Sequence, residues 1–102
     1  MSLLESREII TEFMKNLSMV KEMDDRYKIM EEICKNGEVT MAELLGKRRD
    51  RPIVDFRHIL FYTLRERAGM TIAEIARETG KNHSTVINGI NKIKSYSIPY
   101  VH

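Results

Sequence analysis

Four consecutive polar residues, Asn82-His83-Ser84-Thr85, stand just after Gly80 and just before an apolar helical pattern. Their side chains suit the edges of DNA bases: asparagine pairs with adenine, and a threonine methyl contacts the methyl of thymine. Histidine can donate to a guanine or thymine acceptor, or to a phosphate. A helix-turn-helix places the first residues of its second helix against base edges in the major groove. The run therefore predicts a base-reading segment, with an ordinary surface histidine and a plain helix cap as the structural alternatives.

A second candidate is the basic loop, residues 46–51. It carries Lys47, Arg48, Arg49 and Arg51 and has no apolar side chain to bury. A narrow, AT-rich minor groove concentrates negative potential and attracts arginine, and the remaining cations can reach phosphates. On composition alone, a solvated loop of charges is the alternative. The position of the loop, just before a long apolar helix in a helix-turn-helix chain, favours contact with DNA.

The elements that must position these residues form a helix-turn-helix pattern. Thr71 can cap the first helix, and Glu74 stands at the capping-box spacing. Gly80 can adopt the positive φ of a sharp turn. Asn82 can cap the second helix, a role that competes with base reading. The predicted buried positions are Ile72, Ile75 and Ala76 on the first helix and Val86, Ile87, Ile90 and Ile93 on the second.

The first 45 residues also read as helix and turn, with no convincing strand pattern. Apolar residues at three- and four-residue spacing predict an amphipathic helix over residues 4–23. Asp24 or Asp25 can cap a second helix, which Asn36-Gly37 terminates. Thr40 has a glutamate three residues on and therefore predicts a short third helix.

A central helix and a final helix complete the pattern. Pro52 fits the first position of the central helix, which Gly69 terminates near Ala68. The last helix is expected to fade near Ser95, and Pro99 forbids a regular continuation. The predicted fold class is therefore all-α: a compact helical bundle that contains a helix-turn-helix and is preceded in the chain by an amphipathic N-terminal helix.

The charge of the chain is distributed unevenly. Its 102 residues are 42% hydrophobic and 31% charged, which is typical of one globular domain. The net charge is only +2, but residues 1–45 hold 6 Lys/Arg and 10 Asp/Glu, whereas residues 46–102 hold 11 and 5. Basic charge is thus concentrated around the helix-turn-helix, as expected when one face meets phosphates.

Several classes of function lack support. No apolar run is long enough to cross a bilayer. Cys34, the only cysteine, cannot form an internal disulfide or a cysteine-rich zinc site and suits a helix core. His58, His83 and His102 show no metal-ligand spacing, and the acidic residues show no pairing suited to acid-base catalysis. We therefore expect no enzyme activity, cofactor or metal, and a location in the reducing cytoplasm.

The order and spacing of these motifs resemble the C-terminal DNA-binding domain of the bacterial chromosomal replication initiator, DnaA. That family has a Leu-Leu-x-Lys-Arg-Arg-x-Arg element, matched by residues 44–51, and a Ser-Leu-x-Glu-Ile segment, matched by residues 71–75. Its signature Gly-Gly-Arg-Asp-His-Thr-Thr-Val becomes residues 80–86, with a turn that is one residue shorter before His83, Asn82 for Asp and Ser84 for Thr. The sequence has no Gly-x-x-x-x-Gly-Lys-Ser/Thr loop, so it predicts the DNA reader without a nucleotide-binding module.

The resemblance implies roles for individual residues. It implies that one loop arginine, which we assign as Arg49, enters the minor groove beside the major groove that is read. It also implies phosphate contacts by Arg57 and Arg65, two helical turns apart on the central helix. Backbone N–H groups of residues 71–73 can receive a phosphate at the start of a helix. The full predicted DNA-binding set is Lys47, Arg48, Arg49, Arg51, Arg57, Arg65, Thr71, Ile72, Ala73, Lys81, Asn82, His83, Ser84 and Thr85.

Two functions remain open at this point. The first is sequence-selective binding of double-stranded DNA, in replication or in regulation, by residues 41–96, with a separate ATPase or replication protein as a further partner. The second is a protein-interaction module that keeps the helical scaffold without specific DNA binding. Residues 1–40 would then complete the core or form a homodimer through the N-terminal helix, and residues 97–102 would be a tail. Neither function involves a membrane.

Overall fold

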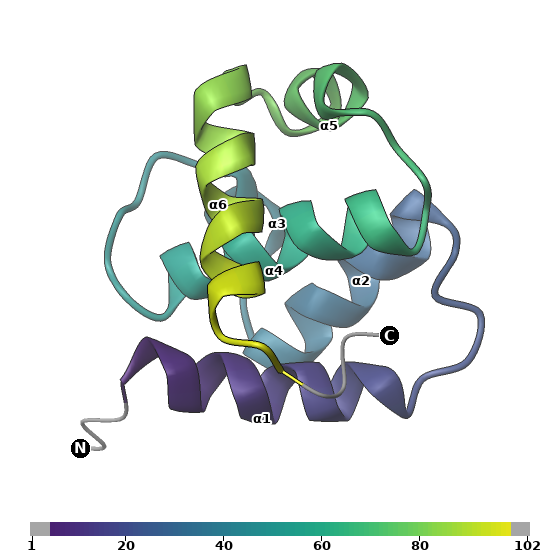
Figure 1. The fold of residues 1–102 in the computed structure, drawn as a ribbon, viewed down its shortest axis with the longest axis vertical. Helices are drawn as coiled ribbons and strands as arrows, with labels where there is room; N and C mark the ends of the chain where they lie inside the picture. The colour runs from purple at the N-terminus through teal and green to yellow at the C-terminus, as the bar shows by residue number, and fades with distance from the viewer. Residues whose placement is uncertain (1–4, 99–102) are drawn as a thin grey trace.

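The computed structural model describes residues 5–98, and this part of the chain is an all-α bundle of six helices (Figure 1). The predicted fold class is confirmed. The helices are α1 (Ser6–Ser18), α2 (Arg26–Gly37), α3 (Met41–Leu45), α4 (Ile53–Glu66), α5 (Ile72–Thr79) and α6 (His83–Ser95). Pro99 and the rest of the predicted tail beyond residue 98 lie outside the described residues. None of the described helices is long and apolar enough to cross a membrane.

The central helix α4 packs against each of the other five helices. Because it is surrounded, it is apolar on almost every side, and Ile59, Leu60 and Phe61 are completely buried. Pro52 is its N-cap rather than its first residue, and the helix ends at Glu66, slightly before the predicted end. This helix therefore provides the fixed frame from which the basic loop and the helix-turn-helix extend.

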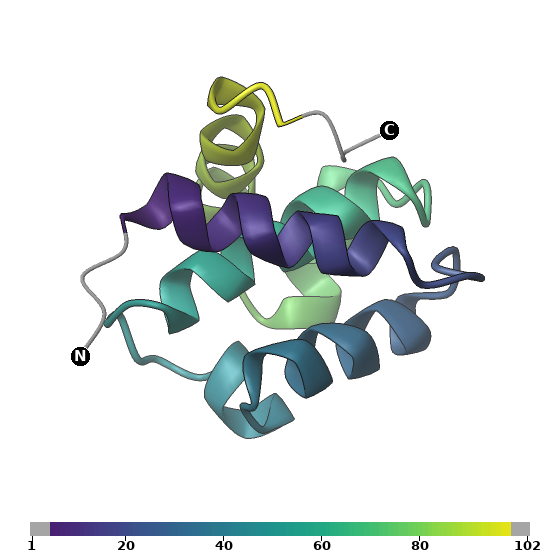
Figure 2. The ribbon, with the colours of Figure 1, turned by 90° about the horizontal axis from the view of Figure 1, so that it is seen from below.

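The amphipathic helix α1 lies across one end of the molecule, away from α5 and the start of α6 (Figures 1 and 2). It is shorter than the predicted 4–23. Its buried residues belong to the same core cluster as those of α4, and the rings of Phe13 and Phe56 lie 4.7 Å apart. The apolar residues that α1 buries are Ile10, Phe13, Met14 and Leu17.

The caps of α2 and α3 fix the approach to the basic loop. Asp25 accepts hydrogen bonds from two backbone N–H groups at the start of α2. At the other end of α2 the left-handed position is Glu38, with φ 55°, and not a glycine as predicted. Gly37 has another function: a Cβ there would lie 2.7 Å from the ring of Phe56, so its absence allows α2 to approach α4. Thr40 and Glu43 form the predicted capping box of α3.

The helix-turn-helix forms as its caps predict. Thr71 and Glu74 make the capping box of α5, and Gly80 ends that helix with φ 69°. Asn82 caps α6 and accepts from the N–H of Thr85 at 2.7 Å. A left-handed glycine between two capped helices gives the sharp turn that sets α6 at an angle to α5.

One predicted core position on α6 was wrong. Ile87 is 43% exposed, whereas Val86, Ile90 and Ile93 are buried as expected. The inward face of α6 instead includes Gly89, where a Cβ would lie 2.7 Å from the ring of Phe61. Because α4 approaches α6 so closely at Gly89, the face of α6 that packs on the core is centred near Gly89. Ile87 therefore lies at the solvent edge of this face.

Candidate nucleic-acid interface

A cleft of about 710 Å³ separates the basic loop from the turn between α5 and α6. Its floor is α4, which contributes Val54, Arg57, His58 and Phe61. The loop side contributes Lys47 and Arg49, and the helix-turn-helix side contributes Gly80, Lys81, Asn82 and Thr85. The structure thus brings two predicted segments, more than thirty residues apart in the chain, to the rim of one hollow.

Arg57 ties the basic loop to the central helix. Its Nε donates to the carbonyl oxygen of Leu44 at 2.7 Å, Nη1 to that of Arg48 at 2.9 Å, and Nη2 to that of Glu43 at 3.3 Å. The residue is only 7% exposed, and burial lowers the pKa of its guanidinium. Because these bonds fix the backbone immediately before Arg49, Arg57 sets where that side chain starts.

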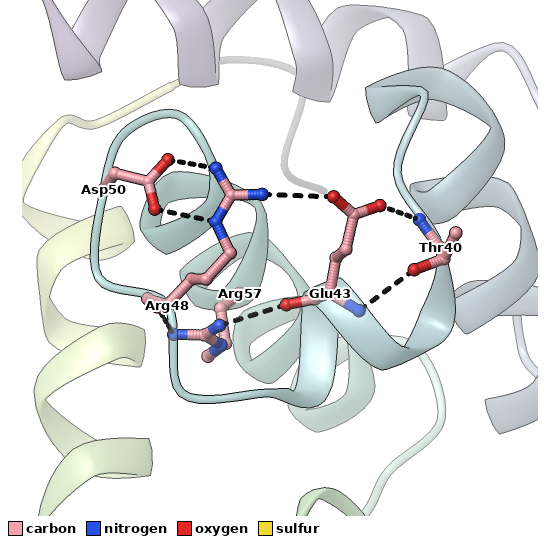
Figure 3. A network of polar contacts seen from close by, with 5 residues as sticks. All are labelled: Thr40, Glu43, Arg48, Asp50 and Arg57. Atoms are coloured by element: carbon pink, nitrogen blue, oxygen red, sulfur yellow. Dashed lines mark hydrogen bonds and ion pairs between the residues drawn. The ribbon is translucent and has the colours of Figure 1, made fainter.

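Arg48 is held by two carboxylates within the loop region (Figure 3). Its Nε and Nη2 donate to the two oxygens of Asp50 at 3.0 and 2.7 Å, and Nη1 donates to Glu43 at 3.1 Å. The same Glu43 accepts from the N–H of Thr40 in the capping box. Asp50 raises the pKa of Arg48, and Arg48 lowers the pKa of Asp50. The charge of Arg48 is therefore largely balanced inside the molecule.

Lys81 connects the two rims of the cleft. Its Nζ donates to the carbonyl oxygen of Gly46 at 2.5 Å. The pKa of Lys81 is lowered, first by burial and then by the nearby charges of Arg57, Lys47 and Arg49. Four cations that repel one another around a hollow create a positive potential that favours an incoming anion.

The predicted base-reading segment is open to solvent. Asn82, His83 and Ser84 are exposed, and Thr85 is half-buried. Oδ1 of Asn82 is committed to the cap, so its amide NH₂ group can donate to a base while the cap stays intact. A bidentate pairing with adenine needs both the oxygen and the nitrogen of the amide, and would require the cap to open.

Two predicted phosphate contacts lie away from the cleft. The exposed Arg65 donates through Nη1 to the carbonyl oxygen of Met70 at 2.9 Å and so braces the connection between α4 and α5. The Nε of Arg51 lies 3.7 Å from Asp55, and Arg51 lines a different hollow together with Arg7 and Lys92.

The start of α5 offers fewer backbone donors than predicted. The N–H of Thr71 donates to the carboxylate of Glu74, and the N–H of Glu74 donates to the hydroxyl of Thr71. Within the described residues, the N–H groups of Ile72 and Ala73 have no hydrogen-bond partner. These two groups are the ones that can receive a phosphate at this helix start.

His58 lines the cleft and was not among the predicted site residues. Its Nδ1 is buried without a hydrogen-bond partner, and burial lowers the pKa of the imidazole. The sequence contains only a weak signal for it, because His58 shares a helical face with the apolar Val54 but lies about 100° around the helix from Arg57. The described residues contain no group of three or more metal-ligating side chains.

Residues 27–93 match the family model described as the bacterial dnaA protein helix-turn-helix. The chain belongs to this family. Membership confirms the resemblance found in the motifs and implies DNA binding by the helix-turn-helix formed by α5 and α6. The DnaA helix-turn-helix is a binding module and not a catalytic one, so no enzyme activity is assigned to the chain.

The relatives are much longer proteins, each a chromosomal replication initiator protein DnaA. The one from Kosmotoga olearia is 37% identical over 89 residues, which is 87% of this chain and 20% of the relative. Those from Thermomicrobium roseum and Lactiplantibacillus plantarum are 37% and 42% identical over 65% and 64% of this chain, and over 14% of each relative. The chain therefore spans about a fifth or less of the length of these relatives. No solved structure matches the chain.

Proposed function

We propose that this chain binds double-stranded DNA sequence-selectively, with Arg49 in the minor groove and the start of α6 in the adjacent major groove. The observation that carries the proposal is the shared cleft, lined by Arg49 on one side and by Asn82 and Thr85 on the other. A loop and a helix start that flank one hollow can hold one phosphate backbone between them while each enters a neighbouring groove.

In this proposal, some of the predicted residues contact phosphates and others contact base edges. Lys47, Lys81 and the N–H groups of Ile72 and Ala73 supply phosphate contacts, which set affinity and register. Arg51 and Arg65 extend these contacts along the backbone on either side. His83, Ser84, Thr85 and the amide group of Asn82 read base edges.

Arg57 and Arg48 have a different task in this proposal. Each of the three guanidinium nitrogens of Arg57 donates a hydrogen bond to a backbone carbonyl. The guanidinium of Arg48 donates hydrogen bonds to two carboxylates. Turning Arg57 outward to a phosphate would take these donors away from the buried carbonyl of Leu44 and from the part-buried carbonyls of Arg48 and Glu43. We therefore assign both side chains to positioning the loop, so that Arg49 is presented to the groove.

The biological role is also a proposal. The relatives are named as chromosomal replication initiators, and this chain corresponds to only a small part of each. We infer that it recognises a DNA site in replication or in gene regulation, within the cytoplasm. We further propose an ATPase or replication protein as a partner that acts beside it on DNA.

Selection of duplexes from a random pool, followed by fluorescence anisotropy on the enriched duplex, tests the proposal. With about five to six phosphate contacts, log K is expected to fall with log salt at a slope of about −5. Arg49→Ala should weaken binding, whereas Lys15→Ala, which removes the same charge from the exposed side of α1, should not. Failure to enrich any sequence, or equal effects of the two substitutions, would refute the proposal.

The alternative is an interaction module that dimerises through α1. It has less support because the apolar residues of α1 are buried in the core of the same chain. Light scattering at high protein concentration separates the two functions. A monomer that binds a selected duplex supports DNA recognition, and a dimer without selective DNA binding supports the alternative.

A further inference from the structure

We propose that Ile87, one turn into α6, reads the C5-methyl group of a thymine in the major groove. The inference rests on the proposed function and deepens it, because it adds an apolar specificity contact to a base-reading segment that is otherwise polar. Nothing in the predicted DNA-binding set anticipates it, since the apolar pattern placed Ile87 in the core.

The exposure of Ile87 is the observation behind the proposal. Its side chain is 43% exposed on a helix whose neighbouring apolar residues are buried. It stands four residues after His83 and three after Ser84, so these three side chains lie on adjacent turns of one face of α6. The other large apolar residues exposed in the described chain, Met19, Tyr27 and Met41, lie outside the helix-turn-helix.

The surroundings of Ile87 favour a base over a protein partner. The next exposed residues along α6, Asn88 and Asn91, are polar amides, so Ile87 is a single apolar side chain on a polar surface. A protein interface needs a contiguous apolar centre far larger than one side chain. In the major groove, the apolar group on base edges is the thymine methyl, and one branched side chain is enough to contact it.

The test uses the duplex that the protein enriches most from a random pool, with each thymine replaced in turn by deoxyuridine, which lacks only the methyl. The parent should lose about fourfold affinity at one thymine, the effect of burying one methyl group. Ile87→Ala should bind the thymine and deoxyuridine forms of that position equally. Ile87→Val keeps a branched apolar side chain and should retain the discrimination.

Two controls make the outcome specific. Met19→Ala removes a more exposed apolar side chain from the C-cap of α1, the helix that lies away from the start of α6 (Figure 1), and should distinguish thymine from deoxyuridine as the parent does. Circular dichroism and the thermal midpoint should be unchanged in Ile87→Ala, because the residue is not part of the core. An unfolded Ile87→Ala would contradict the outer position on which the inference depends.

The failures can be told apart. If the protein enriches no duplex, the proposed function fails and this inference fails with it. If a duplex is enriched but Ile87→Ala distinguishes thymine from deoxyuridine as the parent does, only the inference is overturned. It is also overturned if the parent tolerates deoxyuridine at every position.

Discussion

Replacing Arg57 by methionine tests how the basic loop is held. The substitution keeps an unbranched side chain of similar length and removes the guanidinium that donates to the carbonyl oxygens of Leu44, Arg48 and Glu43. The bond to Leu44 is short and buried, so its loss should cost about 2 kcal/mol of the free energy of unfolding. The other two are part-buried, and water can replace the lost donor, so each should cost about 0.5 kcal/mol.

The expected total is therefore a loss of about 3 kcal/mol, measured by urea unfolding followed by circular dichroism. Arg67→Met is the matched control, because Arg67 is exposed at the end of the same helix, and it should change stability by less than about 0.5 kcal/mol. Arg57→Lys has one ammonium group in place of three aligned donors, so its free energy of unfolding should lie between those of the parent and Arg57→Met.

This experiment also separates positioning from direct contact with DNA. A residue that only contacts phosphate leaves the stability of the free protein unchanged when it is replaced. If Arg57→Met unfolds at the same urea concentration as the parent but binds DNA more weakly, the reasoning from the carbonyl contacts is refuted. If it is less stable, and its DNA affinity falls under conditions where it is still folded, the positioning role is supported.

Three further predictions concern the loop, the helix contact and the buried histidine. Asp50→Asn removes one negative charge beside Arg48, while the amide oxygen and Glu43 can still accept from Arg48 and keep the loop in position. Duplex affinity at low salt should therefore rise and the salt slope should steepen by about one phosphate contact; unchanged anisotropy titrations would contradict this. Gly89→Ala should lower stability by about 1–3 kcal/mol because its Cβ would lie 2.7 Å from Phe61, although alanine normally stabilises a helix, and a raised thermal midpoint would disprove the close contact. Burial disfavours the charged form of His58 and lowers its pKa in the folded protein below the ordinary value of 6.5. The unfolded chain therefore binds a proton more readily, and the stability of the fold should fall as the pH drops below 6.5. His58→Gln has no imidazole to protonate, so its thermal midpoint should fall less than that of the parent as the pH drops below 6.5. An equal fall in both proteins would refute the lowered pKa of His58.

The local features of the fold could be predicted from the sequence because each depends on a few neighbouring residues. Thr71 with Glu74, the left-handed Gly80 and the cap at Asn82 are set by backbone hydrogen bonds within one helical turn. The helix-turn-helix followed from these three signals. The same kind of signal placed the capping box at Thr40.

The features that depend on distant contacts were not predictable in this way. The exposure of Ile87 follows from how closely α4 approaches Gly89, and a helical period alone does not fix which edge of an apolar stripe faces the core. The bonds of Arg57 depend on where the backbone of α3 and the loop returns to α4. A sequence motif shows that an arginine is there, but not whether it faces a phosphate or three carbonyl groups.

The central claim is that the basic loop and the start of α6 read adjacent grooves of one duplex. The most direct test replaces each A·T pair of the selected duplex by inosine·cytosine, which keeps the minor-groove pattern of A·T and changes the major-groove pattern. A pair that is read in the minor groove should tolerate the inosine replacement in the parent, and we predict that Arg49→Ala loses sequence selectivity only at such pairs. A pair that is read in the major groove should not tolerate it, and we predict that His83→Ala loses sequence selectivity only at such pairs, next to the first ones. If both substitutions affect the same pairs, or if neither changes the pattern, the loop and the helix do not read two grooves as proposed.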